Sequence, residues 1–403
     1  MRIPCMEASF IPPFCPNPGC AHHLQGTHAH APDPGTADQP FWKRHGAYHT
    51  SRDGWIPRFR CRICGRTFGE PAFRLWYYAK KPLDLGQIFR SLSAGESLAS
   101  IGRHLACRPE SIQNRLERLG RASLALQARL TGRLSYSEDL VADGFEAFER
   151  SQFFPSHLNI LVGADSQFLY GMTHVTLRRK GRMTDAQKRR RAAIEQRFRP
   201  PPGAQVRAFL NLIRQIPRHW DHSRLPSLTL RTDEHPAYPK ALSRLPALVE
   251  SLHDGCFHHA TYASTLPRTT ANPLFPVNYH DRELRKDIAG FRRETTCVIR
   301  NVGSGCLRTS CHMAWHNFQK PHRVRGEHSG RARPTHAEMA GIPTERIQTC
   351  LTRLFIDRPF PARDPLPDWA VAIWMRRYPT PLAARPDYVP KFWLVDPQQA
   401  SGF

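Results

Sequence analysis

The chain has 403 residues, 40% of them hydrophobic, which is enough for two to four domains with buried cores. Lys and Arg number 58 against 34 Asp and Glu, a formal net charge of +24. This surplus favours a polyanionic partner such as nucleic acid, and a merely basic enzyme is the alternative. No stretch reaches the roughly 18 apolar residues of a membrane span, and residues 1–15 lack the apolar run of a signal peptide. We therefore expect a cytoplasmic protein with no membrane partner and with reduced cysteines.

The first 78 residues are rich in Pro, Gly, His and Cys, and they contain two pairs of closely spaced cysteines. Each pair lies on a turn that can bring two thiolates together, and two such pairs complete a tetrahedral zinc site. We expect a zinc-ribbon domain at 1–78 that binds a structural Zn²⁺. Its predicted ligands are Cys15, Cys20, Cys61 and Cys64. His22 and His23 are alternative ligands.

Residues 82–132 carry apolar side chains at helical spacing in three short segments. Gly95 ends the first segment, and Pro109 begins the third after a tight turn. This pattern is typical of a helix-turn-helix domain, and an ordinary three-helix bundle is the alternative. We expect the last helix to expose side chains that suit the DNA major groove. These candidate DNA-binding residues are Gln113, Asn114, Arg115 and Arg118.

Residues 136–330 alternate between strand-like and helical segments and predict an α/β domain. Four strands are expected in "EDLVADGFEAF", "HLNILVGAD", "FLYGMTHVTL" and "LPSLTLRTD". A basic insert near 178–203 separates the last two and is expected to be helical from Asp185 to Phe198. Its charges suit either a solvated helix face or a phosphate backbone. The Pro-rich segment after Phe355, within a C-terminal extension at 331–403, is expected to be extended and irregular.

Two aspartates lie where strands are expected to deliver them. Asp143 lies near the end of a short apolar strand, and Asp233 ends another before a helix that begins with proline. Carboxylates at strand ends are held on rigid backbone and can share a cleft. With a third acid they can bind two Mg²⁺ ions that activate a hydroxyl and stabilise the leaving oxygen in phosphodiester transfer.

The order of these features resembles a bacterial insertion-sequence transposase of the DDE class, over residues 15–343. The resemblance rests on "VADGFE", "LRTDEHPAY", "NPLFPVNYHDRELRKDIAGFRRETTCVIRN" and "AWHNFQKPHR". It implies a multidomain α+β chain with a ribonuclease H-like catalytic core at 136–330. It also implies metal-dependent cleavage and strand transfer on double-stranded DNA, by a homo-oligomer on DNA in the bacterial nucleoid.

The third acid departs from the pattern of these relatives. Where they have Glu, then Asn three residues later, this sequence has Asn278 and Asp281, while Arg285 matches. In a helix from 278 to 294 the expected buried stripe is Leu284, Ile288 and Phe291. Asp281 borders that stripe, whereas Glu283 and Asp287 are expected on the solvated face. We therefore expect Asp281 as the third ligand, with Glu283 as its main rival and Glu294 more distant.

Two other readings remain open from the sequence. The departure at Asn278 favours a DNA-binding regulator or a domesticated transposase that lacks catalysis. An RNA-binding or RNA-processing protein would share the charge but leave the helix-turn-helix pattern unexplained. A second group has looser spacing and is interpreted mainly as core residues, with a metal site as the alternative. It consists of Cys306, Cys311, His312 and His316.

Overall fold

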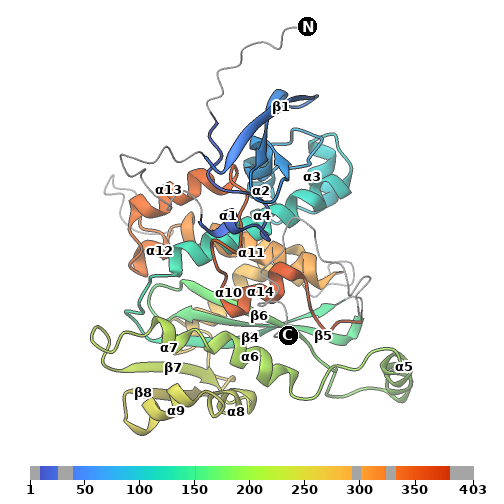
Figure 1. The fold of residues 1–403 in the computed structure, drawn as a ribbon. Helices are drawn as coiled ribbons and strands as arrows, with labels where there is room; N and C mark the ends of the chain where they lie inside the picture. The colour runs from blue at the N-terminus through green and yellow to red at the C-terminus, as the bar shows by residue number, and fades with distance from the viewer. Residues whose placement is uncertain (1–9, 26–39, 150, 293–300, 324–332, 382–403) are drawn as a thin grey trace. The chain divides into compact units, whose positions relative to one another are not determined.

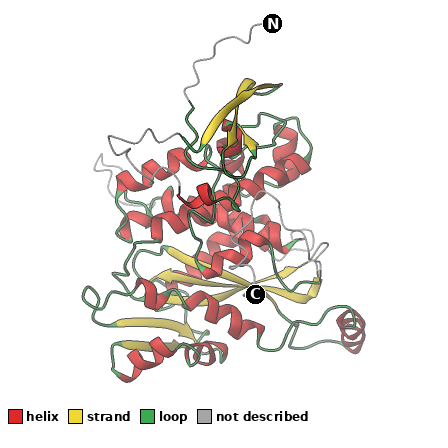
Figure 2. Cartoon of the chain, in the orientation of Figure 1, coloured by secondary structure: helices red, strands yellow, loops and turns green. Residues whose placement is uncertain are grey.

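The computed structural model of the chain describes residues 10–25, 40–149, 151–292, 301–323 and 333–381 (Figure 1). The chain divides into two compact units. The first contains residues up to Asp84 together with Arg353–Pro365, and the second contains Leu85–Thr352 and the segment from Leu366. Both helices and sheets are present, as Figure 2 shows, so the expected mixed α+β composition is confirmed. Within the described ranges no helix is both long and apolar enough to cross a membrane.

The first unit is built on a three-stranded antiparallel sheet in the order β1-β2-β3. A hairpin joins the first two strands, and Gly54 supports its turn with φ +67°. Phenylalanine rings and three cysteines form the buried core beside the sheet. The elements are α1 (Ala21–Gln25), β1 (Trp42–Thr50), β2 (Gly54–Cys61), β3 (Thr67–Phe68) and a 3-10 helix, η2 (Glu70–Phe73).

The second unit begins with the three helices expected at 82–132, namely α2 (Leu85–Ser93), α3 (Leu98–His104) and α4 (Pro109–Thr131). Gly95 ends the first with φ +86°, and Pro109 begins the third, as predicted. The third helix is 23 residues long and packs along α11 (Val302–Phe318). A Cβ on Gly120 would lie 2.7 Å from the backbone of Leu307, so glycine permits this close approach. The three helices therefore belong to the same compact unit as the five-stranded sheet described below.

A five-stranded sheet forms the rest of this unit, in the order β6-β5-β4-β7-β8. The first three strands in that order are antiparallel, and β7 and β8 join them in parallel. Four strands match the predicted segments, while the fifth, β8, was not predicted. The strands are β4 (Leu140–Glu149), β5 (Ser151–Gly163), β6 (Leu169–Thr176), β7 (Leu228–Asp233) and β8 (Phe257–Tyr262).

Helices cover both faces of this sheet, with α10 and α11 on one side and α6 on the other (Figure 1). The helices that follow β6 are α5 (Asp185–Glu195), α6 (Ala204–Ile213), α7 (Ile216–His219), α8 (Ala237–Leu242), α9 (Pro246–His253) and α10 (Phe275–Asp287). The basic insert is helical as predicted, but its helix ends three residues earlier, and none of its side chains is buried. The helix expected at 278–294 is likewise displaced. It ends at Asp287, and the 3-10 helix η3 (Ala289–Phe291) follows.

The C-terminal region is more ordered than its proline content predicts. Its helices are α12 (His336–Met339), α13 (Thr344–Leu354) and α14 (Asp368–Met375). Trp369 and Trp374 of α14 are buried, and the helix packs on β6 and α6 of the second unit. The expectation of an irregular extension is therefore wrong for residues 368–375, because apolar side chains between the prolines supply a face that the sheet unit buries.

Candidate active site

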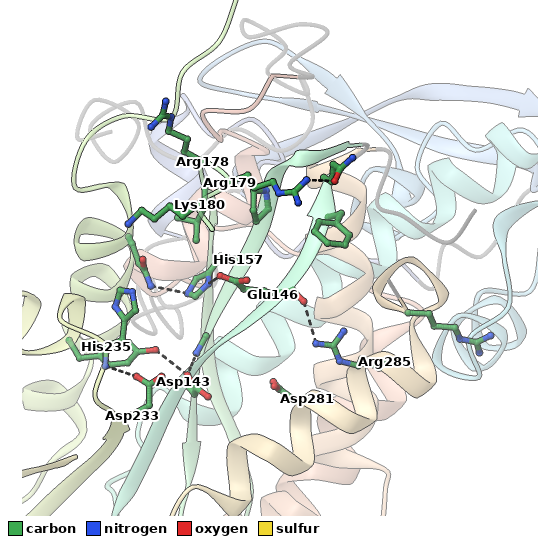
Figure 3. Close-up of a pocket in the computed structure, with 18 of the residues that line it drawn as sticks. Asp143, Glu146, His157, Arg178, Arg179, Lys180, Asp233, His235, Asp281 and Arg285 are labelled. Atoms are coloured by element: carbon green, nitrogen blue, oxygen red, sulfur yellow. Dashed lines mark hydrogen bonds and ion pairs between the residues drawn. The ribbon is translucent and has the colours of Figure 1, made fainter. Parts of the chain in front are cut away.

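Asp143 and Asp233 lie on neighbouring parallel strands. Leu140 pairs with Leu230 and Val141 with Arg231, and continuing this register by two residues places Asp143 opposite Asp233. Asp233 ends β7 as predicted. Asp143, however, is the fourth residue of a ten-residue strand and lies well before its end. Neighbouring parallel strands therefore deliver both carboxylates to one edge of the site (Figure 3).

Short polar contacts hold both carboxylates in place. Asp143 Oδ1 accepts from the backbone N–H of Gly144 at 2.6 Å and from the hydroxyl of Tyr238 at 3.2 Å. Asp233 Oδ1 accepts from the backbone N–H of His235 at 2.8 Å. Tyr238 belongs to α8, so the helix that follows Asp233 also fixes Asp143.

Asp281 projects from α10 and lines the same cavity as Asp143 and Asp233 (Figure 3). Arg285, one turn further along, lines it too, whereas Asn278 is not among the described residues that form its wall. The buried stripe predicted for this segment is confirmed, because Leu284, Ile288 and Phe291 are all buried. Of the two positions, Asp281 and not Asn278 therefore contributes to the wall of this cavity.

Glu283, the alternative third acid, forms ion pairs outside the cavity. Glu283 has a side chain only 5% exposed and forms ion pairs with Lys320 and Lys286. Asp287 is also buried. The expectation that Glu283 and Asp287 are surface charges is therefore wrong, because Lys320, after α11, supplies a positive charge that lets α10 bury an acid. Glu294 lies outside the described residues.

The cavity has a volume of about 950 Å³, and basic residues surround its carboxylates. Arg285 donates to the backbone carbonyl of Glu146 at 3.3 Å and lies over the ring of Phe145. A wall that mixes acids with several cations could bind a polyanion beside the carboxylates. The acids are Asp143, Glu146, Asp233 and Asp281, and the cations are Arg178, Arg179, Lys180, Arg268, Arg285 and Arg292.

Burial and charge change the proton affinity of the central groups. Burial, together with the negative charge of Asp233, raises the pKa of Asp143 to about 6. Burial and the neighbouring carboxylates raise the pKa of Tyr238, so its hydroxyl remains a hydrogen-bond donor. A carboxyl with this raised pKa is a common feature of catalytic and metal-binding sites.

His157 is a lining residue that the sequence did not indicate. Its ring packs against Gly144, where an added Cβ would lie 2.0 Å from the imidazole Cε1. Its Nε2 contacts Asn159 Oδ1 at 3.1 Å and Gln205 at 3.4 Å. Its Nδ1 lies 3.6 Å from a carboxylate oxygen of Glu146 and has no hydrogen-bond partner among the described residues. An imidazole therefore lies beside Asp143, with its buried Nδ1 close to Glu146.

The four predicted cysteines form a candidate metal centre in the first unit. Their sulfur atoms all lie within 4.8 Å of one another, with Cys15 and Cys64 Sγ 3.7 Å apart and Cys20 and Cys61 Sγ also 3.7 Å apart. Four buried or half-buried thiols at this spacing can hold a structural metal such as zinc. The alternative ligand His23 instead bonds the carbonyl oxygen of Cys15 at 2.7 Å through Nδ1.

In the described part of the chain, the four cysteines are the only group of three or more His, Cys, Asp or Glu side chains found close enough together to hold a metal ion. Asp143, Asp233 and Asp281 line one cavity but do not form such a group. Cys306, Cys311, His312 and His316 are buried along α11 and do not form such a group either. Their interpretation as core residues agrees with this burial.

The four predicted DNA-contacting residues do not form one exposed face. Arg115 is only 4% exposed, so the expectation that it faces solvent is wrong. Gln113 donates to Ser304 Oγ of α11 at 2.8 Å. Asn114 is exposed, and its side-chain oxygen accepts from Arg118 Nε at 2.9 Å. The packing of α4 against α11 covers part of this face. A local helical pattern does not predict such a long-range contact.

Comparison with known proteins does not assign the chain to a family. No family model matches the chain, and no curated protein matches it.

Proposed function

We propose that this chain is a DNA transposase of the DDE class, with Asp143, Asp233 and Asp281 as its catalytic acids. The observation that carries the proposal is their convergence on one cavity walled by six basic side chains. The sheet order, three antiparallel strands followed by two parallel ones, supports a ribonuclease H-like core. The proposed partner is double-stranded DNA, bound by a homo-oligomer, and a structural Zn²⁺ would occupy the four cysteines.

The donor set fits two Mg²⁺ ions, because magnesium prefers carboxylate oxygens and the phosphates of its substrate. Bound there, the ions would activate the attacking hydroxyl and stabilise the leaving oxygen. Asp143 and Asp233 are held by Gly144, Tyr238 and His235, so their oxygens are oriented before substrate arrives. Asp281 lines the same cavity and would complete the set.

The basic wall would position the DNA strand. Arg178, Arg179 and Lys180, in the segment after β6, contribute to the wall of the cavity (Figure 3). Water would attack the phosphorus atom and release a 3′-hydroxyl, and that hydroxyl would then attack a target phosphodiester and displace its 3′-oxygen.

A strand-transfer assay on DNA that carries the element ends tests this function. Asp143→Asn and Asp233→Asn are expected to abolish metal-dependent cleavage and joining, since each removes a charged ligand. Asp165→Asn is the matched control, because Asp165 is exposed in a turn and does not line the cavity. Full activity in either of the first two variants would contradict the proposal.

A DNA-binding regulator without catalysis is the second candidate. It is favoured by Asn278 in place of an acid, and by the absence of the three aspartates from the metal-binding groups found in the described residues. Titration with Mg²⁺ or Mn²⁺ separates the two functions. A regulator would bind specific DNA without metal-dependent cleavage, whereas a transposase would nick the same DNA once metal is added.

A further inference from the structure

A second cavity lies in the first unit, apart from the proposed catalytic site. It has a volume of about 490 Å³, within the range of about 300–1,000 Å³ typical of ligand pockets. Four aromatic residues besides Phe68, together with three cations and a single acid, contribute to its wall. These residues are Tyr48, Trp76, Tyr77 and Tyr78, then Arg52, Arg58 and Lys80, with Asp53 as the acid. We call this set the aromatic pocket.

Tyr78 presents its ring to solvent. It is 71% exposed, although tyrosine usually buries its ring, and the ring centroid lies 4.4 Å from that of Tyr77. Its backbone has φ +59°, a left-handed conformation that is costly for a bulky side chain. Such strain is retained mainly where it serves function. The local backbone therefore holds an aromatic face outward at the mouth of the pocket.

The cations of the pocket lie beside its rings. The guanidinium of Arg52 lies 4.8 Å from the ring centroid of Trp76, and that of Arg58 lies 5.1 Å from that of Tyr48. Lys80 is exposed two residues after Tyr78. Three positive charges against the one negative charge of Asp53 leave the pocket with an excess of positive charge. This pairing of exposed aromatic faces with cations suits a ligand with a flat ring and a phosphate.

We propose that the aromatic pocket binds an unpaired nucleotide of single-stranded DNA, with its base stacked on Tyr78 and its phosphate on the neighbouring cations. In a duplex both faces of each base are already stacked, so an exposed ring gains little there. An unpaired base offers a π-face whatever its sequence, and backbone charge adds to the binding. This inference does not depend on catalysis at Asp143.

Fluorescence anisotropy with the full chain and a labelled oligothymidylate of about twelve nucleotides tests the proposal. A duplex of equal length is measured in parallel, in moderate salt and without added divalent metal. Tyr78→Ala is expected to weaken single-strand binding by at least about fivefold and to leave duplex binding within about twofold. Tyr78→Phe, which retains the ring, should bind as the wild type does.

Trp55→Ala is the matched control, because Trp55 is 40% exposed on β2 but does not line the pocket. It should leave single-strand binding unchanged. Because binding is measured without added divalent metal, the result does not depend on the proposed catalysis. Equal losses for single strand and duplex in Tyr78→Ala, or no loss at all, would overturn the proposal. Complete competition by thymidine monophosphate at the concentration of the oligonucleotide would also overturn it, since the ligand would then be a free nucleotide.

Discussion

Asp143 lies beside Asp233 in a partly buried position, and its carboxyl is costly to ionise. Its pKa is raised from 3.8 to about 6, so the folded metal-free chain binds this proton more tightly than the unfolded chain does. Stability contributed by the protonated form is therefore present at low pH and lost as the pH rises through about 6. A bound divalent cation would reverse this balance, because it interacts with the ionised carboxylate.

Asp143→Asn should consequently stabilise the metal-free chain at about pH 8 by about 1–3 kcal/mol, with little effect at about pH 4. Thermal melts across this pH range measure the difference. Added Mg²⁺ should raise the melting temperature of the wild type and leave that of the variant unchanged. If the variant melts lower than the wild type in metal-free buffer at neutral pH, burial is not the main cause of the raised pKa.

Gly144 and His157 are coupled by contact across β4 and β5. Gly144→Ala would place a methyl group 2.0 Å from the imidazole, and neither paired strand can move aside easily. We expect a loss of about 1–3 kcal/mol in unfolding free energy. Urea denaturation of a double-mutant cycle checks the cause. The loss from Gly144→Ala should shrink in a His157→Ala background, and strict additivity would show that the contact is not its source.

The residues of the two candidate sites could be predicted from the sequence where a short local pattern determines their position. Asp233 follows an apolar strand directly, and the cysteine pairs have ligand spacing, so both could be predicted from the sequence. His157 could not, because its role depends on the cross-strand neighbour Gly144, thirteen residues away. The contact of Gln113 with Ser304 likewise involves a helix nearly two hundred residues later in the chain.

Helix α10 is held to the end of α11 by a buried ion pair. Burial alone would raise the pKa of Glu283, but the hydrogen bond and charge of Lys320 bring it below its ordinary value. This contact lies two residues from Asp281 and fixes the helix that carries it. Periodicity predicted the buried stripe of α10 correctly but assigned Glu283 to solvent, because the partner cation lies in a distant segment.

Lys320→Met should destabilise the chain by about 2–4 kcal/mol, since it removes one partner from the buried acid. The double variant Lys320→Met with Glu283→Gln should recover most of that loss, because no buried carboxylate then lacks its partner. Chemical denaturation measures both. A double variant as unstable as the single one would show that Lys320 acts through packing of its stem and not through charge.

At the scale of the whole molecule, the cysteine centre and the acidic cavity belong to different compact units. Removal of metal with a chelator should therefore unfold the first unit and leave the second folded, as seen by calorimetry in two transitions. Cys61→Ser should reproduce the effect by removing one ligand. A single transition that shifts as a whole on chelation would contradict this independence.

The order of motifs along the chain predicted the mixed composition and four of the five core strands. It did not predict how the chain divides, because that depends on long-range packing. Gly120 of α4 packs closely against Leu307 of α11, so helices α2 to α4 belong to the second compact unit. The prolines after Phe355 predicted an irregular chain. A helix nevertheless forms among them, and its side chains Trp369 and Trp374 are buried.

The central claim is that Asp143, Asp233 and Asp281 form a metal centre, and the most direct measurement is an anomalous difference map from crystals soaked in Mn²⁺. The proposed function predicts density between the carboxylates of Asp143 and Asp233, with Asp281 turned toward it. Metal at the four cysteines serves as the internal reference for occupancy. A map with density at the cysteines but none in the acidic cavity, at saturating Mn²⁺, would contradict the proposed catalytic site.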